Sequence, residues 1–225
     1  MESVQQDCIA AGARPGDVLV LPLDIEDKAA MPAAVAALRK HFGRIDLLLN
    51  NAGMSQRALG LDTDMSVYRR IIQVDLLGQI ALTKQVLPLM VEQGSGTLAV
   101  TSSVAGKVGV PMRTAYCAAK HGVMGLNVTT VVPGAIRTSV AHNALTGSGE
   151  ARGMEEPGVE AGMDAGECAR VIADGFAGGV EEINVGTGPE MRLLDMKRQD
   201  PTATFRLLES WIADMAQGKT PGLGK

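Results

Sequence analysis

The sequence is poor in aromatic residues and lacks any cluster of basic ones. Aromatic side chains make up 3% of its 225 residues, and the net charge at pH 7 is -4. Proteins that bind nucleic acids usually present a basic patch or aromatic stacking surfaces, so this composition argues against a nucleic-acid partner. Hydrophobic residues account for 46% of the chain, which is ordinary for a folded protein. The length suits one large domain, so we expect a single domain over residues 1–225.

Signals for secretion and membrane insertion are also lacking. Residues 1–7 contain neither the basic nor the apolar segment of a signal peptide. No uninterrupted apolar run approaches the ~20 residues that cross a bilayer, so we expect no membrane span. Cys8, Cys117 and Cys168 are odd in number and widely spaced, which argues against a disulfide framework and a zinc site. We therefore expect reduced thiols, no bound metal and a cytoplasmic location.

Short apolar segments alternate with helical patterns along the chain. Buried strands are predicted at residues 17–23, 45–49, 96–101, 128–132 and 182–185. Helices are predicted at residues 29–42, 65–93, 112–125, 165–176 and 189–215, with an irregular, Gly-rich stretch at 136–162. This alternation is typical of an α/β fold in which helices cover both faces of a parallel sheet.

The residues that follow the predicted strands suggest a ligand-binding edge. In open parallel sheets, ligands bind at the carboxyl ends of the strands. The residues found there are small or polar: Asp24 after the first strand, Asn50 to Gly53 after the second, Ser102 and Ser103 after the third, and Pro133 and Gly134 after the fourth. We expect these residues to line one rim of the sheet.

Tyr116 and Lys120 are four residues apart on a predicted helix and therefore share a face. A Lys ammonium near a phenol favours phenolate, which makes Tyr116 a usable proton donor or acceptor near neutral pH. Ser103 ends the preceding strand, where its hydroxyl could hydrogen-bond a substrate oxygen on which charge develops. The structural alternative is that Tyr116 and Lys120 form a surface pair and that Ser103 is a helix cap.

Taken together, these motifs resemble those of the short-chain dehydrogenase/reductase family. The quoted motifs are Asn50-Asn51-Ala52-Gly53 after a strand, Ser103, Tyr116-Cys-Ala-Ala-Lys120 thirteen residues later, and Pro133-Gly134-Ala-Ile136-Arg-Thr138. The resemblance extends over residues 17–138 and more loosely to about residue 185. It implies a Rossmann-like parallel sheet flanked by helices, and hydride transfer between NAD or NADP and a carbonyl or secondary alcohol.

The resemblance also assigns roles to individual residues. It makes Tyr116 the general acid/base, lets Lys120 tune Tyr116, and lets Ser103 stabilise the substrate oxygen. The implied cofactor-binding residues are Asp24 at the adenine ring, Asn51, Ala52 and Gly53 beside the adenosine, Tyr116, Lys120 at the nicotinamide ribose, and Pro133, Gly134, Ile136 and Thr138 around the nicotinamide. Without the family, Asn51 would be interpreted as a turn residue and Asp24 as a helix cap.

The chain departs from the family pattern in three respects. It is truncated at the N-terminus relative to that pattern, because it lacks the opening strand and the Thr-Gly-x-x-x-Gly-x-Gly loop that follows this strand. In the family, the amides of that loop and the N-terminus of the next helix hold the pyrophosphate. Residues 146–153 are Gly-rich, but their spacing is wrong and no strand precedes them. The helix of Tyr116 is short, which weakens the helix packing of family dimers. Asp75 stands where the family usually has Asn; we expect it to join the proton relay, although an ionised carboxylate cannot donate.

The first two family strands are also missing from the pattern, which leaves residues 45–49 as an apolar edge. We expect residues 17–23 to pair directly with 45–49, in the sheet order 17–23, 45–49, 96–101, 128–132, 182–185. If that ladder is missing, the chain is better regarded as an incomplete domain.

Two functions remain open from the sequence. The first is an NAD(P)-dependent oxidoreductase acting on a small apolar carbonyl or secondary alcohol, as a homo-oligomer. The alternative is a non-catalytic remnant that binds no cofactor and only self-associates. A hydrolase based on Ser103 is rejected, because it needs a nucleophile elbow and a His partner, and His41, His121 and His142 fit no such order.

Overall fold

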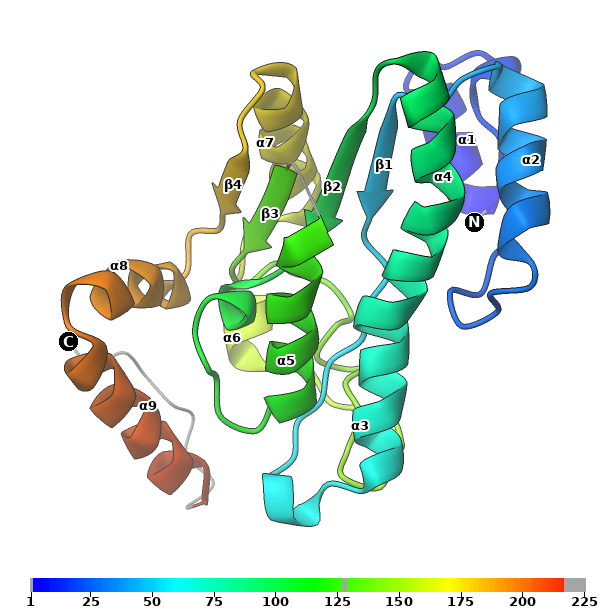
Figure 1. Cartoon of the computed structure of the whole chain (residues 1–225). Coiled ribbons are helices and arrows are strands. Elements are labelled where there is room, and N and C mark those ends of the chain that lie inside the picture. The colour runs from blue at the N-terminus through cyan, green and yellow to red at the C-terminus, as the bar shows by residue number, and fades with distance from the viewer. Residues whose placement is uncertain (1, 127–128, 217–225) are drawn as a thin grey trace.

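A parallel sheet forms the centre of the chain in a computed structural model that describes residues 2–126 and 129–216. Within this described part the sheet has four strands, which are hydrogen-bonded in chain order (Figure 1). They are β1 (Leu47–Asn50), β2 (Thr97–Thr101), β3 (Thr129–Pro133) and β4 (Glu182–Val185). Leu49 lies opposite Ala99, and Val131 lies opposite Ile183, so the carboxyl ends of the strands meet at one edge.

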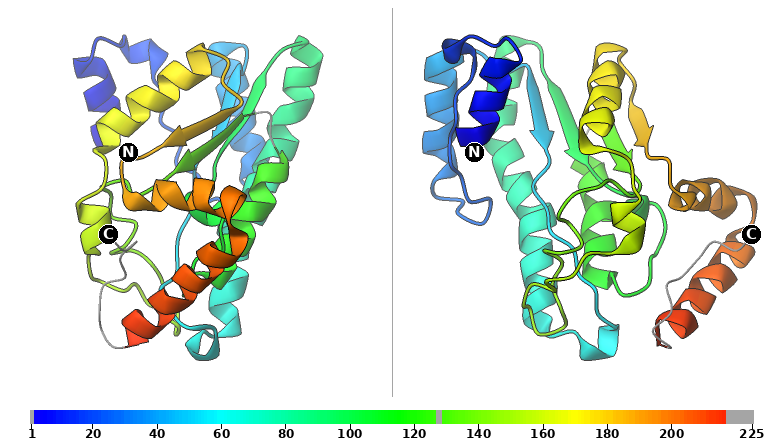
Figure 2. Two further views of the ribbon diagram at one scale, coloured as in Figure 1. Left: turned by 90° about the vertical axis from the view of Figure 1, so that its left-hand side faces the viewer. Right: turned by 180° about the vertical axis from the view of Figure 1, so that it is seen from behind.

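Helices lie on both faces of the sheet, as the sequence predicts for this α/β fold. They are α1 (Glu2–Ala10), α2 (Met31–Phe42), α3 (Met65–Ile72), α4 (Gln79–Gln93), α5 (Thr114–Val123), α6 (Pro157–Glu160), α7 (Ala165–Ala177), α8 (Arg192–Gln199) and α9 (Pro201–Ala216). α4 and α5 cover one face and α7 covers the other, while α8 and α9 extend beyond β4 (Figure 2). The short helix predicted for Tyr116 is confirmed, because α5 gives way to a single turn at Met124–Leu126.

α3 and α4 form one continuous helix from Met65 to Gln93, joined by a π-helical turn at Gln73–Gly78. π-Turns inside α-helices often mark functional sites. Here the turn is packed tightly, since a Cβ on Gly78 would lie 2.6 Å from the carbonyl oxygen of Ile25. The turn carries Asp75, which is fully buried.

The sequence predicts no membrane span, because no uninterrupted apolar run is long enough, but this continuous helix has the length and the mean hydropathy of one. By length and composition it meets that criterion, with a mean hydropathy of 1.3 over its most apolar window, of which 39% is buried. Core helices of soluble proteins meet the same criterion. In this structure α3 contacts α5, and α4 contacts α2 and β1, so the helix serves as a core element of the fold.

The predicted strand at residues 17–23 is wrong. Within the described residues this segment has no ladder with β1, and the sheet order begins at β1. Pro22 has no N–H to donate to a ladder, and the carbonyl oxygen of Val18 instead accepts a hydrogen bond from Gln5 Nε2 (3.2 Å). β1 is therefore the open edge of the sheet, where Leu47 and Leu49 are 43% and 37% exposed.

Strand boundaries differ slightly from those predicted. β1 begins and ends later than residues 45–49, because Ile45 is buried beneath α2 and α4 before the ladder starts. β3 begins at Thr129, and Val128 lies outside the described residues. The core helices and strands were otherwise placed within a few residues.

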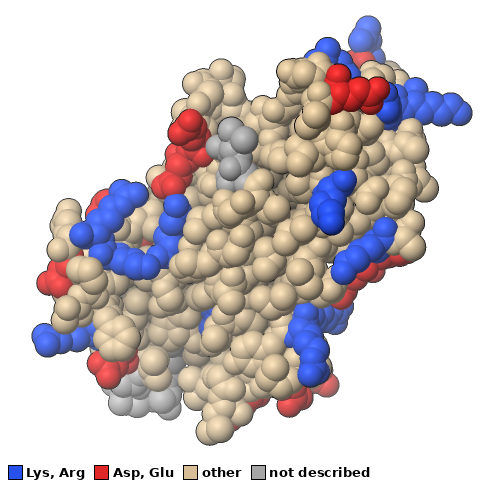
Figure 3. Space-filling model, in the orientation of Figure 1, with Lys and Arg blue, Asp and Glu red and all other residues tan. Residues whose placement is uncertain are grey.

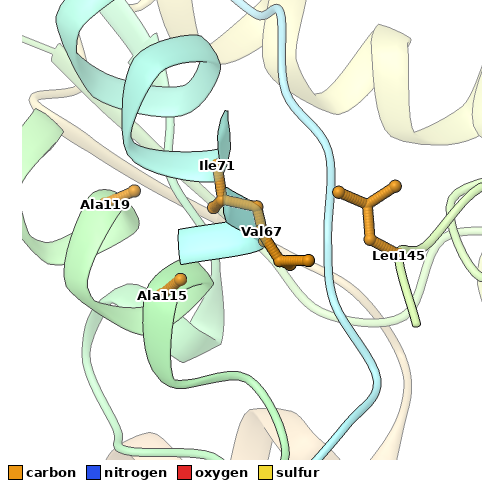
Figure 4. Close-up of a cluster of buried hydrophobic side chains, with 5 residues drawn as sticks. All are labelled: Val67, Ile71, Ala115, Ala119 and Leu145. Atoms are coloured by element: carbon orange, nitrogen blue, oxygen red, sulfur yellow. The ribbon is translucent and has the colours of Figure 1, made fainter. Parts of the chain in front are cut away.

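A cluster of buried side chains fixes α5 against α3. Val67 and Ile71 come from α3, Ala115 and Ala119 from α5, and Leu145 from the loop after β3 (Figure 4). The two alanines let the helices approach closely, because an alanine side chain extends no further than Cβ. This packing sets the position of the helix that carries Tyr116 and Lys120.

The surface seen in Figure 3 has basic and acidic side chains interspersed around a wide uncharged area. No basic stripe crosses this face.

Candidate active site at the ends of the strands

The carboxyl ends of the strands are linked to one another by hydrogen bonds. Thr101 Oγ1, at the end of β2, donates to Asn51 Oδ1 (2.9 Å), just beyond β1. The amide of Ser102 donates to the carbonyl oxygen of Val131 (2.8 Å), and the amide of Gly134 donates to that of Val185 (2.8 Å). The rim predicted from the sequence is therefore formed, with the residues after β1, β2 and β3 side by side.

Lys120 and Asp75 form a buried ion pair at this rim. The side chain of Lys120 is 4% exposed and that of Asp75 is 0% exposed, and Lys120 Nζ lies 3.5 Å from Asp75 Oδ2. Lys120 Nζ also donates to the carbonyl oxygen of Thr101 (2.9 Å), while Asp75 Oδ1 accepts from the amide of Met54 (2.8 Å). The interpretation of Lys120 as part of a surface pair is therefore wrong.

Gly53 lies directly over this pair. A Cβ at this position would be 3.1 Å from both Asp75 Oδ2 and Lys120 Nζ, closer than most side-chain contacts allow. The glycine therefore lets the loop after β1 approach the charged groups. The π-turn, α5, β2 and this loop all contribute to one cluster.

Burial raises the pKa of Asp75 to about 6, although the charge of Lys120 and the hydrogen bond from Met54 act in the opposite direction. Asp75 Oδ2 has no hydrogen-bond partner among the described residues. A carboxyl group with this pKa is partly protonated near neutral pH, and its protonated form donates a hydrogen bond. The change from the usual Asn to Asp therefore removes less donor capacity than the sequence suggested.

This raised pKa predicts a pH-dependent stability. An acid whose pKa is higher in the folded state than its ordinary value of 3.8 stabilises the fold fully below that value and loses this contribution as the pH rises through about 6. We expect the free energy of unfolding to fall by ~2 kcal/mol between about pH 4 and about pH 7 on this account. Urea unfolding across that range measures it. The Asp75→Asn variant should lack this component, and an unchanged pH profile in that variant would contradict the assignment.

Tyr116 stands next to the buried pair. Its ring centroid lies 5.6 Å from Lys120 Nζ. The half-buried ring packs against the cluster of Val67 and Ala119 that joins α3 to α5. No described residue makes a hydrogen bond to the phenol, which leaves its hydroxyl available to a ligand. The face shared by Tyr116 and Lys120, predicted from their spacing, is confirmed.

Ser103 and Ser102 have different roles. Ser103 Oγ accepts a hydrogen bond from the amide of Ala105 (3.1 Å) and so caps the turn Val104–Gly106, as the structural alternative held. A hydroxyl that accepts one bond still has its proton to donate, so the cap is compatible with a role toward substrate. The buried Ser102 Oγ donates to the carbonyl oxygen of Lys120 (2.8 Å) and fastens β2 to α5. The sequence placed Ser102 at the end of the strand beside Ser103 but predicted no role for its side chain.

Two buried polar side chains of α4 hold the loop after β1, and sequence reasoning missed both. Gln79 Nε2 donates to the carbonyl oxygen of Ala52 (2.6 Å), and Thr83 Oγ1 accepts from Asn50 Nδ2 (3.0 Å). Their signal was present in the sequence as polar residues four apart in an otherwise apolar helix. They support the loop that carries Asn51 and Gly53.

The residues after β3 are placed by a third missed residue, Glu190. Its Oε1 accepts a hydrogen bond from the amide of Ala135 (2.7 Å), and its carboxylate packs on the Cα of Gly134. Ile136 continues this segment in a bridge to Met163. Pro133, as the last residue of β3, directs the segment to the rim.

Asp24 and Thr138 are used locally in the structure. Asp24 Oδ1 accepts from the amide of Glu26 (2.9 Å), which stabilises a turn; the helix-cap interpretation is wrong, because α2 begins at Met31 and Ala30 is its N-cap. The exposed Thr138 Oγ1 donates to the carbonyl oxygen of Ile136 (3.4 Å). Their assignment to a cofactor stays a prediction.

Comparison with known proteins agrees with this fold and these motifs. The sequence profile described as short chain dehydrogenase matches residues 2–148. The human protein "Dehydrogenase/reductase SDR family member 7" is 32% identical over 217 residues, covering 90% of this chain and 64% of its own length. The chain thus spans under two thirds of that relative.

Solved structures show the same architecture. Levodione reductase is 31% identical, with a TM-score of 0.59 over 63% of this chain and 60% of its own. A short chain dehydrogenase/reductase from Burkholderia phymatum, in complex with NAD, has a TM-score of 0.70 over 100% of this chain and 84% of its own; at 18% identity it supports the fold alone. The profile covers more than half of the chain, and the architecture and the motif order agree with it. The chain therefore belongs to the short-chain dehydrogenase family.

Proposed function

We propose that the protein is an NAD(P)-dependent oxidoreductase that interconverts a carbonyl and a secondary alcohol on a small substrate, with apolar groups around the reacting carbon. The observation that carries this proposal is the buried Lys120 ammonium, held by the Thr101 carbonyl and Asp75, beside the ring of Tyr116. Membership of the short-chain dehydrogenase family supports it. So does the fold shared with a structure that is described as a complex with NAD.

In this proposal each residue acts on one atom. Tyr116 donates its phenolic proton to the carbonyl oxygen during reduction and takes it back during oxidation. The hydroxyl of Ser103 donates a hydrogen bond to the same oxygen. The ammonium of Lys120 favours the phenolate that remains after proton transfer. The nicotinamide, when bound, supplies or accepts the hydride at the carbonyl carbon.

The described residues fit the nicotinamide half of NAD(P) better than its pyrophosphate half. Gly53 leaves the rim without a side chain above Lys120 Nζ, and Tyr116 presents a polar group there, whereas the carboxylate of Glu190 occupies the space beside Gly134. Within the described ranges no strand leads through a Gly-rich loop into a helix, the arrangement that holds a pyrophosphate. We propose that Asn51, Ala52, Gly53 and Lys120 contact the cofactor, and that Asp24, Ile136 and Thr138 lie at its two ends.

The cofactor proposal predicts weak binding. Loss of several charge-assisted hydrogen bonds to the pyrophosphate, each ~1.5–3 kcal/mol, weakens affinity by several orders of magnitude. We expect calorimetry of the 225-residue chain with NADH or NADPH to give a Kd in the high-micromolar range or weaker. The matched comparison is reduced nicotinamide mononucleotide, which should bind almost as well as NADH. Low-micromolar affinity for NADH alone would show that another anion site holds the pyrophosphate.

The open edge at β1 favours a second candidate function, a non-catalytic protein that only self-associates. Leu47 and Leu49 present exposed apolar side chains on β1, which has no second neighbouring strand among the described residues, a combination that promotes strand pairing between chains. The same calorimetry separates the two candidate functions, since a protein that only self-associates would bind neither NADH nor reduced nicotinamide mononucleotide. The edge also supports the proposal that the oxidoreductase is a homo-oligomer.

A further inference from the structure

Three arginines converge on one glutamate outside the cluster of Asp75 and Lys120. Arg57 Nε lies 2.8 Å from Glu156 Oε2, Arg113 Nη2 lies 3.3 Å from Oε1, and Arg152 Nη1 lies 3.9 Å from Oε2. The four residues come from three separate parts of the chain: the segment after β1, the residue before α5, and the loop before α6. Tertiary folding alone brings them together.

The charges in this cluster do not balance. Among the described residues no other acidic side chain pairs with the arginines, so three guanidiniums face one carboxylate and leave two positive charges in excess. This stands out in a chain whose net charge is -4. Burial and, to a smaller extent, the charge of Arg113 lower the pKa of Arg57 to about 10, although Glu156 acts to raise it. Burial raises the pKa of Glu156, but Arg57, Arg113 and Arg152 outweigh it and hold that pKa below its ordinary value.

The cluster also has an unused donor. Arg152 Nη1 is buried and has no hydrogen-bond partner among the described residues. Arg57 Nη1, in contrast, is occupied by Ser55 Oγ (2.7 Å) and the carbonyl oxygen of Gln56 (3.0 Å). The side chains of Arg113 and Arg152 are 24% and 30% exposed, so the cluster borders solvent, although Arg152 Nη1 itself is covered.

The arginine cluster lies beside the proposed proton donor. Arg113 precedes α5, three residues before Tyr116, and Tyr116 packs against the cluster that includes Leu145. The amide of Arg57 donates to the carbonyl oxygen of Leu145 (2.9 Å), in the loop that follows β3. The N-terminal end of α5 adds its own partial positive charge. A molecule held by these arginines therefore has the hydroxyl of Tyr116 within its neighbourhood.

We propose that Arg57, Arg113 and Arg152 form an anion site that binds the carboxylate of a substrate whose carbonyl lies elsewhere in the same molecule. The ligand class is an oxo-carboxylate, because Glu156 already shows that a planar carboxylate fits among these guanidiniums, with Arg57 donating to one of its oxygens and Arg113 to the other. This inference rests on the proposed function for the carbonyl and narrows its substrate class; the anion site itself does not depend on turnover.

The test measures binding by calorimetry, without turnover. The probes are 4-oxopentanoate and its longer homologues, each paired with its methyl ester, and inorganic phosphate. We expect at least one oxo-carboxylate to bind about tenfold more tightly than its ester, because charge-assisted bonds to arginine require the free carboxylate. The Arg152→Gln variant should remove that difference and leave ester binding unchanged. The exposed Arg39, paired with Glu92 on α2 and α4, provides the matched control Arg39→Gln, which should bind as the wild type does.

A second variant separates an anion site from a structural ion pair. In Glu156→Gln the counter-charge is lost, so an anion site should bind the carboxylate more tightly, whereas Arg152→Gln should bind it more weakly. Thermal unfolding of both variants verifies that they fold. The proposal is overturned if acids and esters bind alike, if phosphate binds more tightly than every carboxylate, or if a folded Glu156→Gln weakens carboxylate binding. If the protein binds the oxo-carboxylate but does not reduce its carbonyl with NADPH, the proposed oxidoreductase is refuted and the proposed anion site stands.

Discussion

Replacing Tyr116 by Phe is expected to lower the rate of carbonyl reduction by ~10²- to 10⁴-fold, the usual effect of removing a general acid. The phenol is the only group that gives its proton to the carbonyl oxygen in the proposed reaction, and phenylalanine keeps the ring that packs against Ala119. The loss should appear in kcat, with NADPH affinity unchanged, because the missing hydroxyl acts on the reacting oxygen. Oxidation of saturating NADPH by an oxo-carboxylate measures it.

The second tyrosine of the chain provides a matched control. The sequence contains two tyrosines, and Tyr68 packs on the same cluster as Tyr116 but from α3. Tyr68→Phe removes the same atom from the same core, so it controls for any effect on packing. We expect its turnover to stay within about twofold of the wild type, as for a change away from the reacting atoms. Equal losses in the two variants would exclude Tyr116 as the proton donor.

Replacing Lys120 by Met is expected to destabilise the fold by ~3–5 kcal/mol at neutral pH. Asp75 is 0% exposed, and Lys120 is the basic group that pairs with its carboxylate among the described residues. Removal of the ammonium leaves that charge buried without compensation. It also removes the donor to the Thr101 carbonyl. Urea unfolding at pH 7 compares the variant with the wild type.

The pair is isolated by a double variant. Asp75→Asn removes the buried charge while its amide oxygen can still accept from the Met54 amide. In Lys120→Met with Asp75→Asn we expect most of the lost stability to return, since no uncompensated charge remains. If the double variant is as unstable as the sum of the single ones, the two side chains do not interact and the buried pair has been misassigned.

Local sequence patterns were sufficient to predict those helices and strands that depend mainly on residues close together in the chain. The helices α2, α5 and α7 follow from apolar periodicity and from the glycines near their ends, and the strands β2 to β4 follow from short apolar runs. The four-residue spacing of Tyr116 and Lys120 placed them on one face of α5, because helix geometry alone dictates it.

Pairing between distant segments was the point at which sequence reasoning failed. Residues 17–23 have the composition of a strand, yet they carry no ladder, because strand pairing depends on a partner and on register, which composition does not encode. Glu190 was missed for the same reason, since its contact with the Ala135 amide spans fifty-five residues.

The sequence by itself determined the order of the helices α2 to α5 and of the strands β1 to β4, and the polar residues at the strand ends, because side-chain period and spacing act within short windows. Its motifs also resemble those of the family to which the chain belongs. Only the tertiary structure decided that Lys120 is buried against Asp75 rather than exposed, and that Ser103 caps a turn. It alone assembled Arg57, Arg113, Arg152 and Glu156. Burial and charge balance are set by what the chain packs around a residue, and those neighbours come from distant positions.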